Sequence, residues 1–285
     1  MLLGAAGYHA GDFRALTDET AAAAAALGLR ALDARTDDPD SVTPGEAARF
    51  REILDRHGIA AGQTAGNYGG GLVSEDGAER ERTVRFVQEM CRLTRLLGSP
   101  TTYLRPGSLN PRGAWLPHPR NRSREVFDRL VDSARQVCAV AEGEGVLVAV
   151  EGGVVSPLYS PERIEAFITA VDSPALGFNQ DPVNLIGSLE QAYDTGALIA
   201  DSFDRLGRWT VSAHVKDFTL VEALLPHFEE AEIGVGMLDQ AAYLTRLQAS
   251  RPGVHAYIEH LPADRFAAAV AAVTAISRSA GIEWD

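Results

Sequence analysis

The sequence is poor in cysteine and in basic charge, and each shortage excludes a class of protein. Only two cysteines occur, Cys91 and Cys138, which rules out a disulfide scaffold and a cysteine-based zinc site. Asp and Glu number 39 against 26 Lys and Arg, so the formal net charge is −13. That charge repels phosphate backbones, and the densest basic stretch, residues 112–129, also carries Glu125 and Asp128. We therefore expect no nucleic-acid partner.

Long hydrophobic runs are also lacking. No stretch approaches the roughly 18 apolar residues that a membrane span needs, and the alanine run at 21–26 lies between charged residues. The short apolar run at the N-terminus has no basic segment before it, which argues against a secretory signal. We therefore expect a cytoplasmic protein with no membrane partner. The chain does have 285 residues and 46% apolar types, enough to bury a sizeable core.

Short apolar runs alternate with longer segments of helical period along nearly the whole chain. The expected strands are residues 2–6, 29–34, 59–64, 101–105, 146–151, 176–180, 209–214 and 255–259. The expected helices are residues 18–27, 44–57, 79–97, 124–144, 161–171, 189–205, 239–247 and 262–279. The long connections 66–78, 106–123 and 218–237 each follow an expected strand.

Strict alternation of strands and helices implies a parallel sheet, because each return crossing needs a helix over the sheet. Repeating units of about 36 residues favour a closed (β/α)8 TIM barrel over an open doubly wound sheet. The first strand also lacks the Gly-x-Gly-x-x-Gly turn of a dinucleotide site. No polar linker divides the chain, so we predict a single α/β domain over residues 1–285. The long connections then lie on the C-terminal face, where substrate loops belong.

Four polar side chains end the last four expected strands, at the face where a barrel binds its ligand. They are Glu151, Asp181, His214 and Glu259, separated by 30, 33 and 45 residues. Taken singly, each acid is explained by pairing with a neighbouring Arg or Lys. Together at one barrel mouth, the acids would repel one another without a cation. The oxygen-rich set suits one divalent metal ion, Mn²⁺ or Mg²⁺, with Co²⁺ or Zn²⁺ as alternatives.

The same residues lie in motifs that resemble a known family over nearly the full chain. The motifs are Val148-Ala-Val-Glu151, Gln180-Asp-Pro-Val-Asn184, His214-Val-Lys-Asp217, Glu232-Ile-Gly-Val-Gly-Met-Leu-Asp239 and the strand-end Glu259. This pattern is similar to the xylose isomerase-like TIM barrels, the sugar phosphate isomerase/epimerase superfamily. The resemblance implies a single divalent metal bound by Glu151, Asp181, His214 and Glu259.

Two departures from the family pattern bear on the substrate. Asn184 stands where many of the family's epimerases have a histidine, and Gly152-Gly153 follows Glu151 where the family usually has Asn or Pro. The resemblance therefore carries no particular substrate with it. The change at Asn184 also gives weight to a lyase on the same scaffold.

The favoured reaction is isomerisation or epimerisation of a sugar or polyol ketone, by proton transfer through an enediolate. Glu151 and Glu259 are the expected acid/base pair, with Asp181 and His214 as metal ligands only. The alternative is a lyase that dehydrates an inosose or dehydroshikimate, or cleaves an oxidised glycoside by β-elimination. A nuclease for abasic DNA fits the charge poorly, and a non-catalytic module that keeps the metal is the remaining alternative.

Other strand-end residues are candidates for binding the substrate. We expect His9, Arg105, Asn184 and Lys216 to contact it, and Asp217 to fix its loop by a salt bridge. Trp115 and His118 are expected to form either a lid or a partner surface. The last loops lack a Gly-rich, basic phosphate nest, so we expect a neutral carbohydrate. A homo-oligomer is also expected from the resemblance.

Overall fold

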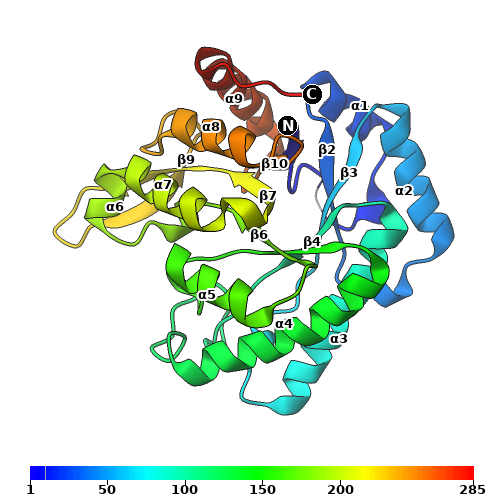
Figure 1. The fold of residues 1–285 in the computed structure, drawn as a ribbon. Coiled ribbons are helices and arrows are strands. Elements are labelled where there is room, and N and C mark those ends of the chain that lie inside the picture. The colour runs from blue at the N-terminus through cyan, green and yellow to red at the C-terminus, as the bar shows by residue number, and fades with distance from the viewer. Residues whose placement is uncertain (10) are drawn as a thin grey trace.

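A closed barrel of eight parallel strands forms the centre of the molecule (Figure 1). The computed structural model describes residues 1–9 and 11–285. The barrel strands are β1 (Leu2–Ala5), β2 (Ala31–Arg35), β3 (Ala60–Ala65), β4 (Thr101–Leu104), β5 (Leu147–Val150), β6 (Leu176–Gln180), β7 (Thr210–Val215) and β10 (His255–Ile258). Their order around the barrel is β1-β10-β7-β6-β5-β4-β3-β2, and β1 pairs with both β10 and β2. The prediction of a TIM barrel is confirmed, and the open sheet is excluded.

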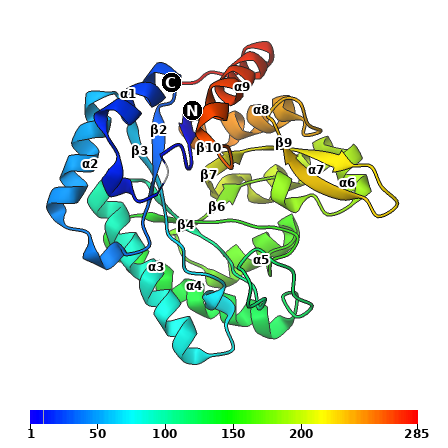
Figure 2. The same cartoon turned by 180° about the vertical axis from the view of Figure 1, so that it is seen from behind.

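The helices form a ring outside the barrel, as the two opposite views show (Figures 1 and 2). They are α1 (Asp18–Ala26), α2 (Pro44–Arg56), α3 (Gly77–Leu97), α4 (Arg124–Glu144), α5 (Pro161–Val171), α6 (Leu189–Tyr193), α7 (Thr195–Leu206), α8 (Gln240–Ser250) and α9 (Phe266–Ala280). Each of α1 to α8 begins after a Ser, Thr or Asp whose side chain accepts a backbone N–H of the first turn. These caps set where each helix starts above its strand.

The structure differs from the sequence-based prediction in two places. The connection 218–237 contains an antiparallel hairpin of β8 (Asp217–Val221) and β9 (His227–Ala231), whose Phe218 and Phe228 rings pack edge to face at 5.9 Å. Its many exposed polar residues hide the strand alternation in the sequence. The helix expected at 189–205 is broken at Asp194, which leaves the helical conformation and caps α7 through Ala197 N.

Two features of the interior position the site. Tyr257 of β10 forms a small cluster inside the barrel with Ala6, Ala31 and Ala60, and its hydroxyl accepts the Gln63 N–H at 2.8 Å. A Cβ at Gly4 would lie 2.7 Å from the Tyr257 ring, so glycine makes room for this aromatic filling. The second feature is the outer core between strands and helices, which includes the free thiols of Cys91 and Cys138.

Within the described part of the chain, no helix is both long enough and apolar enough to cross a membrane.

Candidate active site

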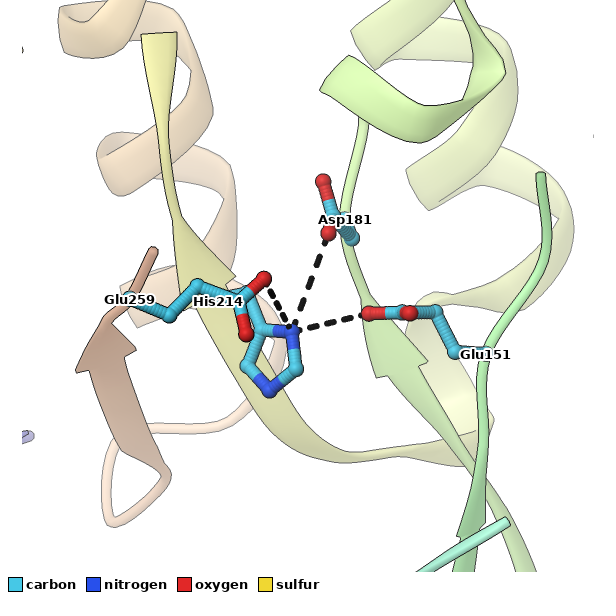
Figure 3. Close-up of side chains that lie close together, drawn as sticks. All are labelled: Glu151, Asp181, His214 and Glu259. Carbon is cyan, nitrogen blue, oxygen red and sulfur yellow. Dashed lines mark ion pairs between the residues drawn. The ribbon is translucent and has the colours of Figure 1, made fainter. Parts of the chain in front are cut away.

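Four side chains from the second half of the barrel converge on one point (Figure 3). Glu151, Asp181 and Glu259 each directly follow a strand, β5, β6 and β10, and His214 lies near the end of β7. One ligand atom from each residue lies within 4.8 Å of the others, and all four residues are buried. The parallel strands bring them together because strand ends 30 to 45 residues apart in sequence meet at one rim of the barrel.

His214 Nδ1 is at the middle of the cluster. It lies 2.8 Å from Glu151 Oε1, 2.9 Å from Glu259 Oε1 and 3.7 Å from Asp181 Oδ2. Among the described residues, neither His214 Nδ1 nor Asp181 Oδ2 has a hydrogen-bond partner of good geometry, although both atoms are fully buried. Buried polar atoms that converge in this way are typical of a set of metal ligands.

Burial and neighbouring charge act against each other on these groups. Burial alone lowers the pKa of His214, but the carboxylates of Glu259 and Glu151 raise this pKa well above its ordinary value. Burial also raises the pKa of Glu151, and His214 offsets only part of that effect. The pKa of Glu259 falls well below its ordinary value, because His214 and Lys216 outweigh burial. The four side chains therefore shift one another's pKa values strongly, and the two glutamates are shifted in opposite directions.

Lys216 is the only lysine in the sequence, and it is buried beside this cluster. Its Nζ lies 2.8 Å from both Asp181 Oδ2 and Glu259 Oε1. Two of the acids therefore do pair with a basic residue, which was the simpler explanation open from the sequence. Three carboxylates and one ammonium leave two negative charges when the imidazole is neutral. A divalent cation would balance them, so the residues present fit such an ion in both charge and donor type.

A second layer of polar residues holds the cluster in place. The Tyr103 hydroxyl donates to Glu151 Oε2 at 2.7 Å, and the Asn179 amide donates to Glu151 Oε1 at 2.8 Å. His214 Nε2 lies 3.4 Å from Gln63 Oε1. Lys216 Nζ donates to Asn184 Oδ1 at 3.1 Å. Asn184 thus helps to orient the lysine.

Asp217 fixes the loop after the hairpin through backbone hydrogen bonds instead of the salt bridge that we expected. Its two carboxylate oxygens accept N–H groups from Phe218, Gly234, Gly236 and Leu238 at 2.9–3.2 Å. A Cβ at Gly236 would collide with this carboxylate, so the position requires glycine. The two adjacent residues of the His-x-Lys-Asp motif therefore have separate tasks, since Lys216 contacts the ligand cluster and Asp217 ties down the loop.

A cavity of about 590 Å³ opens onto the cluster. His214 and Glu259 line it, whereas Glu151 and Asp181 are not among the described residues that do. Polar and aromatic side chains complete the lining, among them Asp33, Arg35, Gln63, Tyr103, Arg105, Trp115 and His260. The cavity has the size of a small-molecule site.

The Gly152-Gly153 pair lets the loop after Glu151 pack closely against its neighbours. A Cβ at Gly153 would lie 2.9 Å from Trp115 Cζ3, and a Cβ at Gly152 would lie 2.5 Å from Ile164 Cδ1. From the sequence, Trp115 was expected to form a lid or a partner surface. In the structure it packs against the loop that follows Glu151 and lines the cavity. Glycine at position 153 is thus what lets the Trp115 ring approach the loop after Glu151.

Sequence reasoning missed several lining residues, chiefly Asp33, Arg35, Tyr103 and His260. Arg35 ends β2 and Tyr103 lies in β4, so the strand-end rule applied to the first four strands would have found them. Arg105, a sequence-based candidate, does line the cavity. His9 bonds through its ring to the Asp12 carbonyl at 2.9 Å and is not among the described lining residues.

The sequence matches the family described as xylose isomerase-like TIM barrel over residues 21–276. The chain belongs to this family. No curated protein matched the sequence.

Solved structures share the fold of this family member at low sequence identity. A D-tagatose 3-epimerase-like protein has a TM-score of 0.75 at 15% identity, with 99% of this chain and 98% of that chain covered. A xylose isomerase-like protein from Mycobacterium smegmatis in complex with magnesium has a TM-score of 0.73 at 15% identity, covering 98% and 96%. A probable 3-DHS dehydratase, AsbF, from Bacillus anthracis has a TM-score of 0.72 at 15% identity, covering 96% and 99%.

Proposed function

We propose that the protein is a divalent-metal-dependent isomerase or epimerase of a sugar or polyol ketone. The observation that carries this proposal is the buried group of three carboxylates and one imidazole within 4.8 Å, open to a cavity through His214 and Glu259. Its similarity to a D-tagatose 3-epimerase-like protein supports a carbohydrate substrate. A cytoplasmic location and a homo-oligomer stay predictions from the sequence.

Glu151, Asp181, His214 and Glu259 would hold the metal ion, with Mn²⁺ or Mg²⁺ favoured by the oxygen-rich set. The ion would supply positive charge that stabilises the negative charge developing on the substrate oxygens. Glu259 moves a proton at the substrate carbon through an oxygen that faces the cavity. Glu151 is the second acid/base group, and Tyr103 and Asn179 hold both of its oxygens in place.

The remaining sequence-based candidates divide into two groups. Arg105 lines the cavity and binds the substrate directly. Lys216 and Asn184 act through the ligands, because the Lys216 side chain is 2% exposed and contacts Asp181 and Glu259. We therefore assign Lys216 and Asn184 as positioning residues. His9 stays a prediction.

The alternative is a lyase on the same scaffold, and one observation favours it. Of the proposed acid/base pair, Glu259 lines the cavity and Glu151 is not among the described lining residues, so one member of the pair faces the substrate. Inversion at carbon by two groups needs one on each face, whereas elimination needs a base on one side and loss of a leaving group. The fold similarity to a probable 3-DHS dehydratase is consistent with this second candidate.

Metal analysis and proton NMR in D₂O test the proposal. The purified protein is analysed for bound metal and then incubated with ketoses, inososes and 3-oxo-glycosides. Deuterium entering at carbon without loss of water supports the isomerase. Loss of water or of an aglycone supports the lyase instead.

Variants at the two glutamates test the assignment of the acid/base pair. Glu151→Gln and Glu259→Gln should each abolish exchange while circular dichroism shows an intact fold. Full exchange in both variants contradicts the assignment. Absence of bound metal together with absence of exchange contradicts the proposed function as a whole.

A further inference from the structure

Two arginine side chains line the cavity on the part of the rim that carries no metal ligands. Arg35 ends β2 and Arg105 directly follows β4, whereas the four ligands come from β5, β6, β7 and β10. The order of the strands places β2, β3 and β4 on one continuous arc. A substrate that reaches the ligand cluster therefore extends toward a pair of guanidinium groups.

Among the described residues, Arg105 has no acidic partner within ion-pair distance. Its guanidinium lies 4.7 Å from the centre of the Tyr68 ring and donates to the Gly66 carbonyl at 3.3 Å. Its Nε is buried and has no hydrogen-bond partner in the described part of the chain. A buried charged donor without an acceptor is costly, and a bound anion would satisfy it.

Arg35 is held in position by a carboxylate that is itself fixed. Arg35 Nε donates to Asp33 Oδ2 at 2.5 Å, and Asp33 Oδ1 accepts the Gly7 N–H at 2.9 Å. The hydrogen bond uses Nε and leaves the terminal nitrogens for a ligand. The Arg35 side chain is 46% exposed, so these nitrogens are accessible. An arginine fixed through Nε is preorganised to bind a second planar anion.

Two of the acidic residues in the lining at this end are already paired with arginines. Asp12 pairs with Arg14 at 2.8 Å and accepts the Thr36 hydroxyl at 2.7 Å. Asp33 is bound by Arg35 as above. Asp37 keeps its negative charge, because its hydrogen bond at 3.0 Å comes from the neutral Asn67 N–H. No ion pair joins Asp37 to Arg105 among the described residues, so the Arg105 guanidinium stays available to a ligand.

We propose that Arg35 and Arg105 form a subsite for a carboxylate, so that the substrate is a sugar acid or polyhydroxy keto acid. This inference rests on the proposed function for the polyhydroxy part of the substrate. It replaces the neutral carbohydrate expected from the sequence. Guanidinium forks also bind phosphate, but phosphate sites on barrels use a Gly-rich nest after the last strands, and the sequence has none there. We therefore assign carboxylate to the subsite, and phosphate is an outcome of the test below.

Calorimetric titration of the full-length, metal-free protein tests the subsite without any catalytic readout. D-Gluconate and D-glucitol share a six-carbon polyol chain and differ at one end, where gluconate has a carboxylate. We expect gluconate to bind at least about tenfold more tightly, as charge-assisted hydrogen bonds predict. Equal binding of the two compounds, or no binding of either, overturns the proposal.

Variants show which residues carry the preference. Arg105→Met and Arg35→Met should each remove most of the tenfold difference, and Arg105→Lys should keep part of it. Arg85→Met is the matched control, because Arg85 is 63% exposed on α3 and outside the cavity lining. Arg35 is the more exposed of the site pair, so its variant keeps the test available if Arg105→Met fails to fold. A preference that survives both substitutions contradicts the proposal.

Two further titrations separate other sources of the same effect. D-Glucose 6-phosphate binding more tightly than gluconate contradicts the assignment of carboxylate. A preference for gluconate that appears only with added Mn²⁺, and survives Arg105→Met, assigns the carboxylate to the metal ion and overturns the subsite. Failure of the proposed function appears separately, as absence of bound metal and of deuterium exchange.

Discussion

The two arcs of the barrel rim differ in how deeply their polar side chains are buried and in how well these are paired. On the arc from β5 to β10, the four candidate ligands are 1% to 7% exposed, and hydrogen bonds fix the cluster from behind. On the arc from β2 to β4, Arg35 is half exposed and Arg105 keeps an unpaired buried nitrogen. Reaction chemistry needs rigid, desolvated groups, whereas substrate recognition needs charged groups that a ligand can still reach. Under the proposed function, the β5–β10 arc carries the chemistry and the β2–β4 arc carries the specificity.

The largest expected effect is the loss of metal binding when one ligand of the β5–β10 arc changes. Asp181→Asn removes one of the two excess negative charges, so we expect Mn²⁺ to bind at least about 100-fold more weakly. Isothermal titration calorimetry measures the affinity. Glu229→Gln on β9 is the control, because Glu229 is 61% exposed and outside the cluster. An unchanged affinity of the Asp181→Asn variant for Mn²⁺ would contradict the assignment of metal binding to the β5–β10 arc.

The next effect concerns the loop that closes the β5–β10 arc. Asp217→Asn replaces one accepting oxygen by a donor, so at least one of the four backbone N–H groups loses its partner. We expect the free energy of unfolding to fall by about 2–3 kcal/mol, measured by urea denaturation. The exposed Asp201→Asn on α7 is the control. A loss below about 0.5 kcal/mol would show that the motif aspartate does not anchor the loop.

A smaller effect is expected where Trp115 packs against the loop after Glu151. Gly153→Ala brings a methyl group to 2.9 Å from the Trp115 ring, so the ring must move. We expect the free energy of unfolding to fall by about 1–3 kcal/mol and the tryptophan fluorescence to change. Gly143→Ala on α4 is the control, because nothing lies within 4 Å of a Cβ there. That control should be neutral or slightly stabilising, and equal behaviour of the two variants would contradict the tight packing.

The smallest effect concerns Asp12, which lies in the cavity lining after β1, next to the β2–β4 arc. Burial raises the pKa of Asp12, but its hydrogen bonds with Arg14 and Thr36 lower this pKa below the ordinary value. A lowered pKa means that the carboxylate adds stability above its unfolded pKa of about 3.9, and that this contribution is lost as the pH falls through the folded pKa. Asp12→Asn should therefore cost under about 1 kcal/mol at pH 7 and less at pH 3. Urea unfolding at both pH values checks it, and a cost that grows toward acid contradicts the sign.

Much of the fold followed from local patterns. Short apolar runs between helical segments indicated the barrel, because each strand and helix is defined by its own neighbours in sequence. The hairpin β8–β9 was missed, because its residues are mostly exposed and polar and lack the apolar alternation of a buried strand. The break at Asp194 was missed because the apolar periodicity of the sequence continues through it. The capping side chain of Asp194 ends one helix and starts the next without altering that periodicity.

The candidate site was predicted only in the part where strand ends carry an acid or an imidazole. Arg35 was overlooked because an arginine after a strand is most often a surface residue, and nothing local shows that it faces a cavity. For Lys216 the sequence predicts a substrate contact, and it does not show that the ammonium lies 2.8 Å from two of the proposed ligands. That contact depends on where β6, β7 and β10 lie relative to one another.

The order of strands and helices, and the residue type at each strand end, are written in the sequence alone, since they depend on short-range periodicity. Closure of the barrel decided the rest. It placed β10 beside β7 and β1, which brought Glu259 to His214 across 45 residues of chain, and it set two arginines at the other side of the same mouth. Distances between residues far apart in sequence depend on how whole elements pack, and no local pattern contains them.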